Sequence, residues 1–223
     1  GHKYNETIVP PTETERGYTH HECSCGDSYD DNYKLAIGRV TKAPKAIENL
    51  VYNKNPQALV SGGEGTGDMY YAVTETDTEP GESSYTRNIP EKTDAKTYYV
   101  WYYSAENETY AKSSVSKIAV TIAKADGKVE LSPSSSTLNY PTEATFTVTS
   151  NESGGTLSVV SDNPSVATAV IEGARVTVTP KNAAGSANII VTSAETDNYN
   201  AASATYVASV NGALAVTANG YVG

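Results

Sequence analysis

The sequence predicts an all-β protein built from tandem β-sandwiches, and three observations support this fold class. The richest runs of β-branched and aromatic residues, at 97–103 and 115–122, suit a pleated sheet better than a helix. Apolar residues and threonines alternate along 144–149, which places one face of a strand in a core. Turn-forming clusters interrupt these runs at the spacing of short sandwich strands. These clusters lie at 61–67, 151–155 and 162–165.

The composition limits the classes of function. The 223 residues include 16 basic and 26 acidic side chains, which gives a formal net charge of −10 at pH 7. Such a surface repels phosphate backbones and anionic lipids, so we expect no nucleic-acid partner and no membrane insertion. No apolar run approaches the roughly 18 residues that a membrane-spanning helix needs. A hydrophobic fraction of 38%, with 17 tyrosines and one phenylalanine, suits thin sandwiches better than one thick core.

A short sequence motif that occurs twice in the chain predicts the domain organisation. Ser104-Ala-Glu-Asn-Glu-Thr-Tyr110 and Ser193-Ala-Glu-Thr-Asp-Asn-Tyr199 share Ser-Ala-Glu and a tyrosine four residues after the glutamate. Their offset of 89 residues matches the size of one small sandwich. The expected parts are a small unit, two sandwiches, and the start of a further module or a linker. Their respective ranges are 1–42, 43–125, 126–210 and 211–223.

The two ends of the chain suggest a longer parent protein. The chain starts at Gly1 and its one methionine is Met69, so we expect an excerpt or a processed product. The first 20 residues are polar and lack the apolar region of a signal peptide. The final segment, 211–223, alternates like the opening of another strand. Neighbouring modules of a longer chain are therefore expected partners.

Both sandwiches resemble immunoglobulin-like families at particular residues. The first carries Leu50-Val-Tyr-Asn-Lys-Asn-Pro-Gln57 and closes on 118–124, and it resembles the bacterial Ig-like repeats of Gram-positive surface proteins. The second carries Ser161-Asp-Asn-Pro-Ser-Val-Ala167 and Asn188-Ile-Ile-Val-Thr192, and it resembles the group 2 bacterial Ig-like domain. The resemblance implies tandem Ig-like β-sandwiches in a bacterial protein that is extracellular or at the cell surface.

A second observation supports the Ig-like fold. The segment 94–100 has the spacing of strand F in immunoglobulin domains, with Tyr98 as the tyrosine corner. Val100 stands where antibody domains carry their second cysteine. We therefore expect an apolar side chain in place of the inter-sheet disulfide.

The N-terminal unit has a different character and is expected to be irregular or a β-hairpin. Its residues Gly1-His-Lys-Tyr4 and Cys23-Ser-Cys-Gly-Asp-Ser-Tyr29 resemble a small repeat in surface proteins of gut clostridia. That repeat often has a cysteine after Pro-Thr, where this chain has Glu13. The departure removes one possible ligand or disulfide partner.

Zinc binding is the sharpest hypothesis for this unit. Cys23 and Cys25, together with His2, His21 or His20, offer a mixed sulfur and nitrogen ligand set. The alternatives are free thiols or a disulfide that closes a very tight ring. Some staple would help so small a unit to fold, and packing on the next module would serve equally well.

The aromatic run offers a candidate binding face. If Tyr98 and Val100 point inward, then Tyr99, Trp101 and Tyr103 share the outer face of the strand. At ~3.4 Å per residue these rings span roughly 14 Å, enough for a row of sugar rings to stack on. The alternative is packing against cross-strand neighbours such as Tyr70 or Tyr71. A glycan or a host or cell-surface protein is the expected ligand under the first interpretation.

No catalytic constellation emerges from the sequence. All three histidines lie in the first 21 residues, so neither sandwich can form a Ser-His or Cys-His pair of its own. We expect a non-catalytic structural or adhesive segment of a secreted or cell-surface bacterial repeat protein, without a cofactor other than structural Zn²⁺. The alternatives are a carbohydrate-binding accessory region of a secreted enzyme and a phage virion decoration domain.

Overall fold

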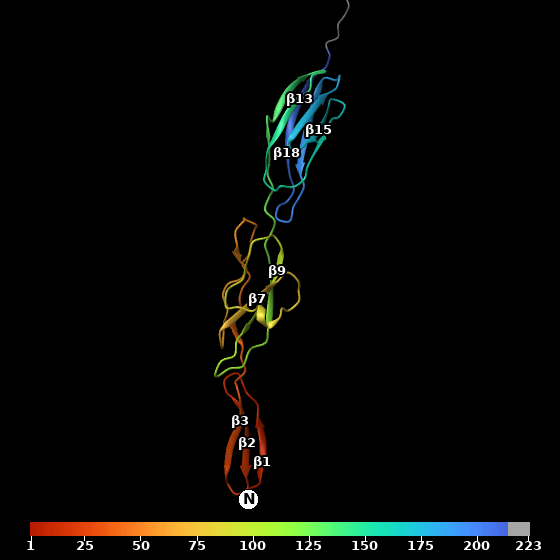
Figure 1. Cartoon of the computed structure of the whole chain (residues 1–223). Coiled ribbons are helices and arrows are strands. Elements are labelled where there is room, and N and C mark those ends of the chain that lie inside the picture. The colour runs from red at the N-terminus through yellow and green to blue at the C-terminus, as the bar shows by residue number, and fades with distance from the viewer. Residues whose placement is uncertain (214–223) are drawn as a thin grey trace, which may run out of the picture. The chain divides into compact units, whose positions relative to one another are not determined.

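The computed structural model describes residues 1–213 and shows an all-β chain (Figure 1). Within this range the one helix is the short 3-10 turn η1 (Glu82–Ser84), and no helix is long and apolar enough to cross a membrane. The chain divides into two compact units, Gly1–Ala123 and Lys124–Gly223. The finer boundaries expected at 42/43 and 125/126 stay predictions. The further module or linker expected at 211–223 lies, from residue 214 onward, outside the described residues.

Unit 1 begins with a three-stranded antiparallel sheet in the order β1-β2-β3 (Figure 1). Its strands are β1 (Tyr4–Val9), β2 (Gly17–Cys23) and β3 (Ser28–Lys34). The turn between β2 and β3 is tight because Gly26 has a φ of +87°, a left-handed conformation that glycine adopts without steric cost. Burial in this sheet is concentrated on the central strand β2. The unit expected to be irregular or a hairpin is thus a complete three-stranded sheet.

The rest of unit 1 is a sandwich of short strands around an apolar core. One sheet has the order β10-β9-β7, and the pairs β4-β6 and β5-β8 complete the fold. The strands are β4 (Val40–Lys42), β5 (Gln57–Ala58), β6 (Glu64–Gly65), β7 (Met69–Thr74), β8 (Glu91–Lys92), β9 (Thr97–Ser104) and β10 (Ser116–Thr121). The core residues are Leu59, Val60, Tyr71, Tyr98, Val100, Tyr102, Val120 and Ile122.

Strand β9 carries the tyrosine corner that the sequence predicts. Tyr98 is 2% exposed, and its hydroxyl donates a hydrogen bond of 3.0 Å to the backbone carbonyl of Asp94. Burial raises the pKa of Tyr98 above its ordinary value, because a phenolate is disfavoured in an apolar core. Val100 is fully buried where antibody domains carry their second cysteine. Both expectations for this strand are confirmed.

Unit 2 is a sandwich of two four-stranded sheets. The sheet orders are β11-β13-β16-β15 and β12-β18-β17-β14, and Figure 1 labels β13, β15 and β18. Lettered along the chain, these are the ABED and A′GFC sheets of an Ig-like sandwich. The strands are β11 (Val129–Ser132), β12 (Ser135–Asn139), β13 (Ala144–Asn151), β14 (Leu157–Ser161), β15 (Ala167–Glu172), β16 (Arg175–Pro180), β17 (Gly185–Ser193) and β18 (Ala202–Asn211). Its core includes Phe146 stacked on Tyr206, with ring centroids 4.2 Å apart.

The repeated sequence motif forms the end of a strand and the loop that follows it in both sandwiches. Ser104 ends β9 and Ser193 ends β17, and both side chains are fully buried. Tyr110 forms a parallel bridge with Ala36, and Tyr199 forms one with Ala125. Each of these pairs keeps the offset of 89 residues. The tyrosine-bearing loop of each sandwich therefore binds the segment that leads into that same sandwich.

Close backbone approach explains the glycine two residues after each of these alanines. A Cβ atom on Gly38 would lie 1.7 Å from the carbonyl oxygen of Ala111, and one on Gly127 would lie 2.5 Å from that of Asn200. Both distances are too short for any side chain. The contact between the tyrosine-bearing loop and the segment that leads into the sandwich therefore requires the local sequence Ala-x-Gly in each unit.

Candidate functional site

The predicted metal ligands gather at the β2–β3 turn of the N-terminal sheet. Cys23 is the last residue of β2 and Cys25 lies in the turn, which the Cys23 N–H closes with a 2.9 Å bond to the carbonyl of Asp27. The register pairs Tyr4 of β1 with Cys23. The residues before β1 therefore run alongside the turn, and they bring His2 to the level of Cys25.

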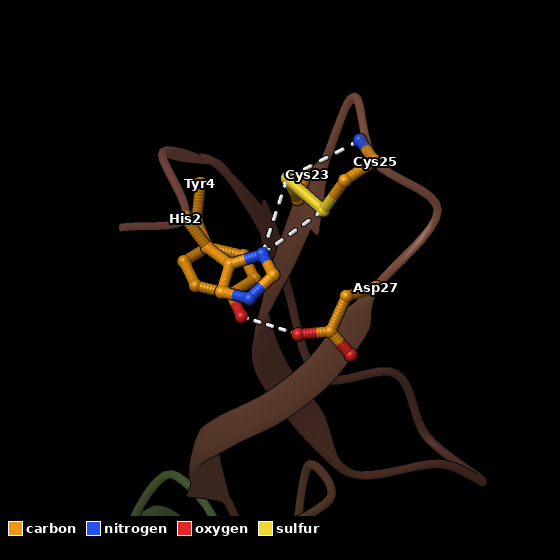
Figure 2. Close-up of a disulfide and its surroundings, with 5 residues drawn as sticks. All are labelled: His2, Tyr4, Cys23, Cys25 and Asp27. Atoms are coloured by element: carbon orange, nitrogen blue, oxygen red, sulfur yellow. Dashed lines mark hydrogen bonds between the residues drawn. A yellow bond between two sulfur atoms is a disulfide. The ribbon is translucent and has the colours of Figure 1, made fainter.

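Cys23 and Cys25 form a disulfide, and the ring of His2 faces both sulfur atoms (Figure 2). His2 Nδ1 lies 3.1 Å from Sγ of Cys25 and 3.8 Å from Sγ of Cys23. Cys23 is 7% exposed, whereas Cys25 and His2 are exposed. One sulfur is thus sheltered and the other faces solvent. Of the states left open by the sequence, the structure contains the disulfide.

Tyr4 and Asp27 form a second contact beside the disulfide (Figure 2). The Tyr4 hydroxyl donates a hydrogen bond to Oδ2 of Asp27. This bond raises the pKa of the Tyr4 hydroxyl above its ordinary value. The turn that carries Cys25 therefore also carries a carboxylate, which favours a bound cation electrostatically.

The other two histidines are engaged by carboxylates of β3. His21 is 7% exposed, its Nε2 lies 2.9 Å from Oδ1 of Asp31, and its ring stacks on Tyr29 with centroids 4.4 Å apart. His20 lies on the opposite face of β2, with Nδ1 2.6 Å from Oδ1 of Asp30. Neither imidazole faces the sulfur atoms.

The structure therefore brings together three of the four predicted metal ligands. Ligand atoms of His2, Cys23 and Cys25 all lie within 4.8 Å of one another. His21 does not join this group, because the facing strand engages its imidazole. Two sulfurs and one imidazole nitrogen are suitable ligands for Zn²⁺ once the sulfurs are thiolates. In this oxidised state they are not, so zinc binding stays a prediction for the reduced chain.

The predicted aromatic row lies on the face of β9 that points away from the core. Trp101 is 8% exposed and Tyr103 is 7% exposed, while Tyr99 is half-buried. The indole N–H of Trp101 donates a 2.9 Å bond to Oγ1 of Thr74. Tyr103 stacks on Tyr70 of β7 with centroids 5.6 Å apart, which is the cross-strand packing weighed as the alternative. Glycan binding by Tyr99, Trp101 and Tyr103 stays a prediction, with little ring surface open for it.

The segment between β7 and β8 covers this aromatic face. Tyr85 is 8% exposed and packs on Tyr103 with centroids 5.0 Å apart. Backbone bonds of 2.7 and 2.8 Å between Tyr71 and Thr86 hold the segment against β7. Sequence reasoning missed this cover because its residues are mostly polar. The one signal available was Tyr85, a lone aromatic residue within that polar stretch.

Lysines lie over the rings at the rim of the covered face. Lys112 Nζ is 4.1 Å from the ring centroid of Tyr103, and Lys117 Nζ is 5.2 Å from that of Trp101. Lys112 also forms a 2.8 Å ion pair with Glu82 of the covering segment. This pair lowers the pKa of Glu82 and raises the pKa of Lys112. The rings of this face are thus already occupied by protein cations.

The hydroxyl of Tyr85 is buried and, within residues 1–213, has no hydrogen-bond partner. Burial, with a smaller contribution from Glu79, raises the pKa of Tyr85 to about 12. A buried polar group without a partner costs about 1–3 kcal/mol of stability. Tyr85 is therefore a weak point in the cover of the aromatic face.

No family model and no curated protein matches the chain. Solved structures do resemble it. The chain is similar to the S-layer protein rSbsC(31-844), with 17% identity, 95% of this chain and 35% of that chain covered, and a TM-score of 0.33. It is also similar to the titin I-band fragment I67-I69, with 12% identity, coverage of 96% and 83%, and a TM-score of 0.39. A third similar structure holds the N-terminal four Ig domains of Dscam1 isoform 6.9, with 13% identity, coverage of 88% and 54%, and a TM-score of 0.35. The chain thus spans about a third of the S-layer structure that it matches.

Proposed function

We propose that this chain is a non-catalytic structural segment of a secreted or cell-surface repeat protein, in which the Ig-like sandwiches act as mechanical spacers. The observation that carries the proposal is the parallel pairing of β12 with β18 in unit 2. This pairing joins a strand near the start of the unit to the last strand that the structure describes in it. It runs from Ser135 opposite Val207 to Asn139 opposite Asn211.

Tension applied at the two ends of unit 2 loads this strand pair in shear. The force pulls β12 toward its own start and β18 toward its own end, so two parallel strands are drawn past each other. Bonds from Val207 N–H to the Ser134 carbonyl, 3.0 Å, and from Tyr140 N–H to the Asn211 carbonyl, 3.2 Å, extend the pairing at both ends. Because these bonds must break together, the arrangement resists pulling. Unit 1 has a reduced version, a parallel bridge between Val51 and Ala123.

The distribution of reactive side chains also supports a structural role. His2 precedes β1, and His20 and His21 lie in β2, so the sandwiches have no imidazole to activate a nucleophile. The partners that we propose are neighbouring modules of the parent chain. A glycan or a surface protein is a further partner where the segment also takes part in adhesion.

Single-molecule pulling tests the spacer role. When the full chain is pulled through its ends, unit 2 should unfold at a higher force than unit 1, because its parallel pairing spans more positions. A matched control attaches the handles at Ser186→Cys and Ser209→Cys, two exposed positions that face each other across the β17–β18 pair. This geometry peels the strands apart one bond at a time, so the force should fall. The proposal is refuted if unit 2 unfolds through the chain ends at a force equal to or lower than the force measured through the control positions.

A further inference from the structure

We propose that His2, Cys23 and Cys25 form a redox-gated site for a thiophilic metal ion of the Zn²⁺ class. In the oxidised chain the disulfide occupies both sulfur atoms and closes the site. Reduction releases two thiols beside an imidazole and opens it. The inference stands apart from the spacer role and concerns the N-terminal sheet alone.

Strand pairing holds the three ligands close enough to bind one ion. The ligand atoms lie within 4.8 Å of one another, whereas a tetrahedral zinc site places its sulfur and nitrogen ligands roughly 3.5 Å apart. The required movement is small, because the sulfurs only need to separate from their bond. His2 Nδ1 already faces both sulfurs at 3.1 and 3.8 Å. The β1–β2 register ends at Tyr4 opposite Cys23, so backbone pairing next to the site places the segments that carry His2 and Cys25 beside each other.

The site formed by His2, Cys23 and Cys25 is open to the small molecules that must reach it. A surface hollow of about 450 Å³ is lined by Gly1, His2, Lys3, Cys23, Ser24 and Cys25. Cys25 is the exposed sulfur, so an attacking thiolate can reach it, and Cys23 becomes the leaving thiolate. The same hollow leaves room for a water molecule as the fourth ligand. An open fourth position follows from three protein ligands.

Reduction of the Cys23–Cys25 disulfide balances in electrons and protons when a low-molecular-weight dithiol is the reductant. The dithiol gives two electrons and two protons to the Cys23–Cys25 bond and becomes a disulfide itself. The two cysteine thiols then release two protons when Zn²⁺ binds, which leaves two thiolates and a neutral imidazole as ligands. Reoxidation by a small-molecule disulfide takes two electrons from the thiolates, re-forms the Cys23–Cys25 bond and expels the ion.

Co²⁺ is the probe of choice, because thiolate ligands give it a sulfur-to-metal charge-transfer band. The full chain is titrated without oxygen, once oxidised and once after treatment with a phosphine reductant. The reduced chain should develop the band, saturate at one ion per chain and lose it when Zn²⁺ is added. The oxidised chain should show no band. Absence of the band after reduction, or equal binding in both states, overturns the proposal.

Variants separate this site from adventitious binding by thiols. Cys23→Ser and Cys25→Ser should each abolish stoichiometric binding. His2→Ala should weaken it by at least about tenfold, because loss of a direct ligand costs no less than loss of an outer-shell partner. The matched control is His20→Ala, which removes an imidazole from the opposite face of β2 and should leave affinity unchanged. Unchanged affinity in His2→Ala refutes the three-ligand set. The ring signals of His21 and Tyr29 in NMR spectra of the reduced chain show whether the sheet persists. Loss of both the sheet and metal binding on reduction also counts against the proposal.

Discussion

At the scale of single residues, two buried tyrosines in unit 1 differ in how their hydroxyl groups are satisfied. The hydroxyl of Tyr98 donates to Asp94, whereas that of Tyr85 has no partner within residues 1–213. Removing a satisfied hydroxyl loses a hydrogen bond, and removing an orphaned one relieves a desolvation cost. The same chemical change should therefore have opposite effects at the two positions.

We expect Tyr98→Phe to lower the free energy of unfolding of unit 1 by about 1 kcal/mol and Tyr85→Phe to raise it by about 1 kcal/mol. Trp101 is the chain's one tryptophan and lies in unit 1, so its fluorescence follows the unfolding of that unit in denaturant. The two variants are matched controls for each other. Destabilisation by Tyr85→Phe would show that its hydroxyl has a partner after all.

The raised pKa of Tyr85 predicts a loss of stability at alkaline pH. The folded-state value of about 12 lies above the ordinary 10.0, so the folded state holds the phenolic proton more tightly than the unfolded chain does. The resulting stability is complete below pH 10 and is lost as the pH rises through the folded-state pKa. Denaturant midpoints measured across this range should fall less steeply in Tyr85→Phe than in the parent chain. Equal slopes would assign the alkaline loss to other groups.

At the scale of elements, local pattern predicted strands well where one face meets a core. The alternation at 144–149 became β13, and the aromatic run at 97–103 became β9 with its tyrosine corner. The parallel β12–β18 pair had no such signal, because its residues lie about 70 positions apart and β12 is mostly Ser and Thr. Pairing between distant strands depends on the whole sandwich and leaves little trace in either sequence.

The candidate sites were only partly predictable for the same reason. Spacing alone placed Cys23 and Cys25 together, but strand register decided that His2 and not His21 faces them. The aromatic row was correctly assigned to the outer face of β9, yet its burial depends on Tyr85 in a polar segment. Sequence periodicity identifies the face of a strand and cannot show what covers that face.

The outer face of β9 therefore gives an element-scale prediction. Trp101→Ala should lower the free energy of unfolding of unit 1 by about 3–5 kcal/mol, because it leaves a cavity in a packed aromatic layer. Circular dichroism measures the change, since the variant lacks the fluorescent probe. Tyr99→Ala, at a less buried ring of the same row, should cost less. Glycan-array binding that disappears in Trp101→Ala while stability holds would contradict this packing role and support the prediction of glycan binding.

At the scale of the whole molecule, each unit carries its own apolar core. The clusters around Leu59 and around Trp101 belong to unit 1, and the cluster around Ile189 belongs to unit 2. The parallel bridge between each tyrosine-bearing loop and the segment that leads into the same sandwich also lies within a single unit. A repeat protein built this way gains length by adding units that each bring a complete core.

Separate cores predict separate unfolding transitions. Ile189 is fully buried, so Ile189→Ala should lower the free energy of unfolding of unit 2 by about 2–5 kcal/mol. Circular dichroism records strands of both units, and its denaturant curve should gain an earlier phase. Trp101 fluorescence, which follows unit 1, should keep its midpoint. Val100→Ala is the matched control, because it removes core volume in unit 1 and should shift the fluorescence midpoint instead. If Ile189→Ala moves the fluorescence midpoint as well, the two units unfold as one cooperative body, and stability is then shared along the chain.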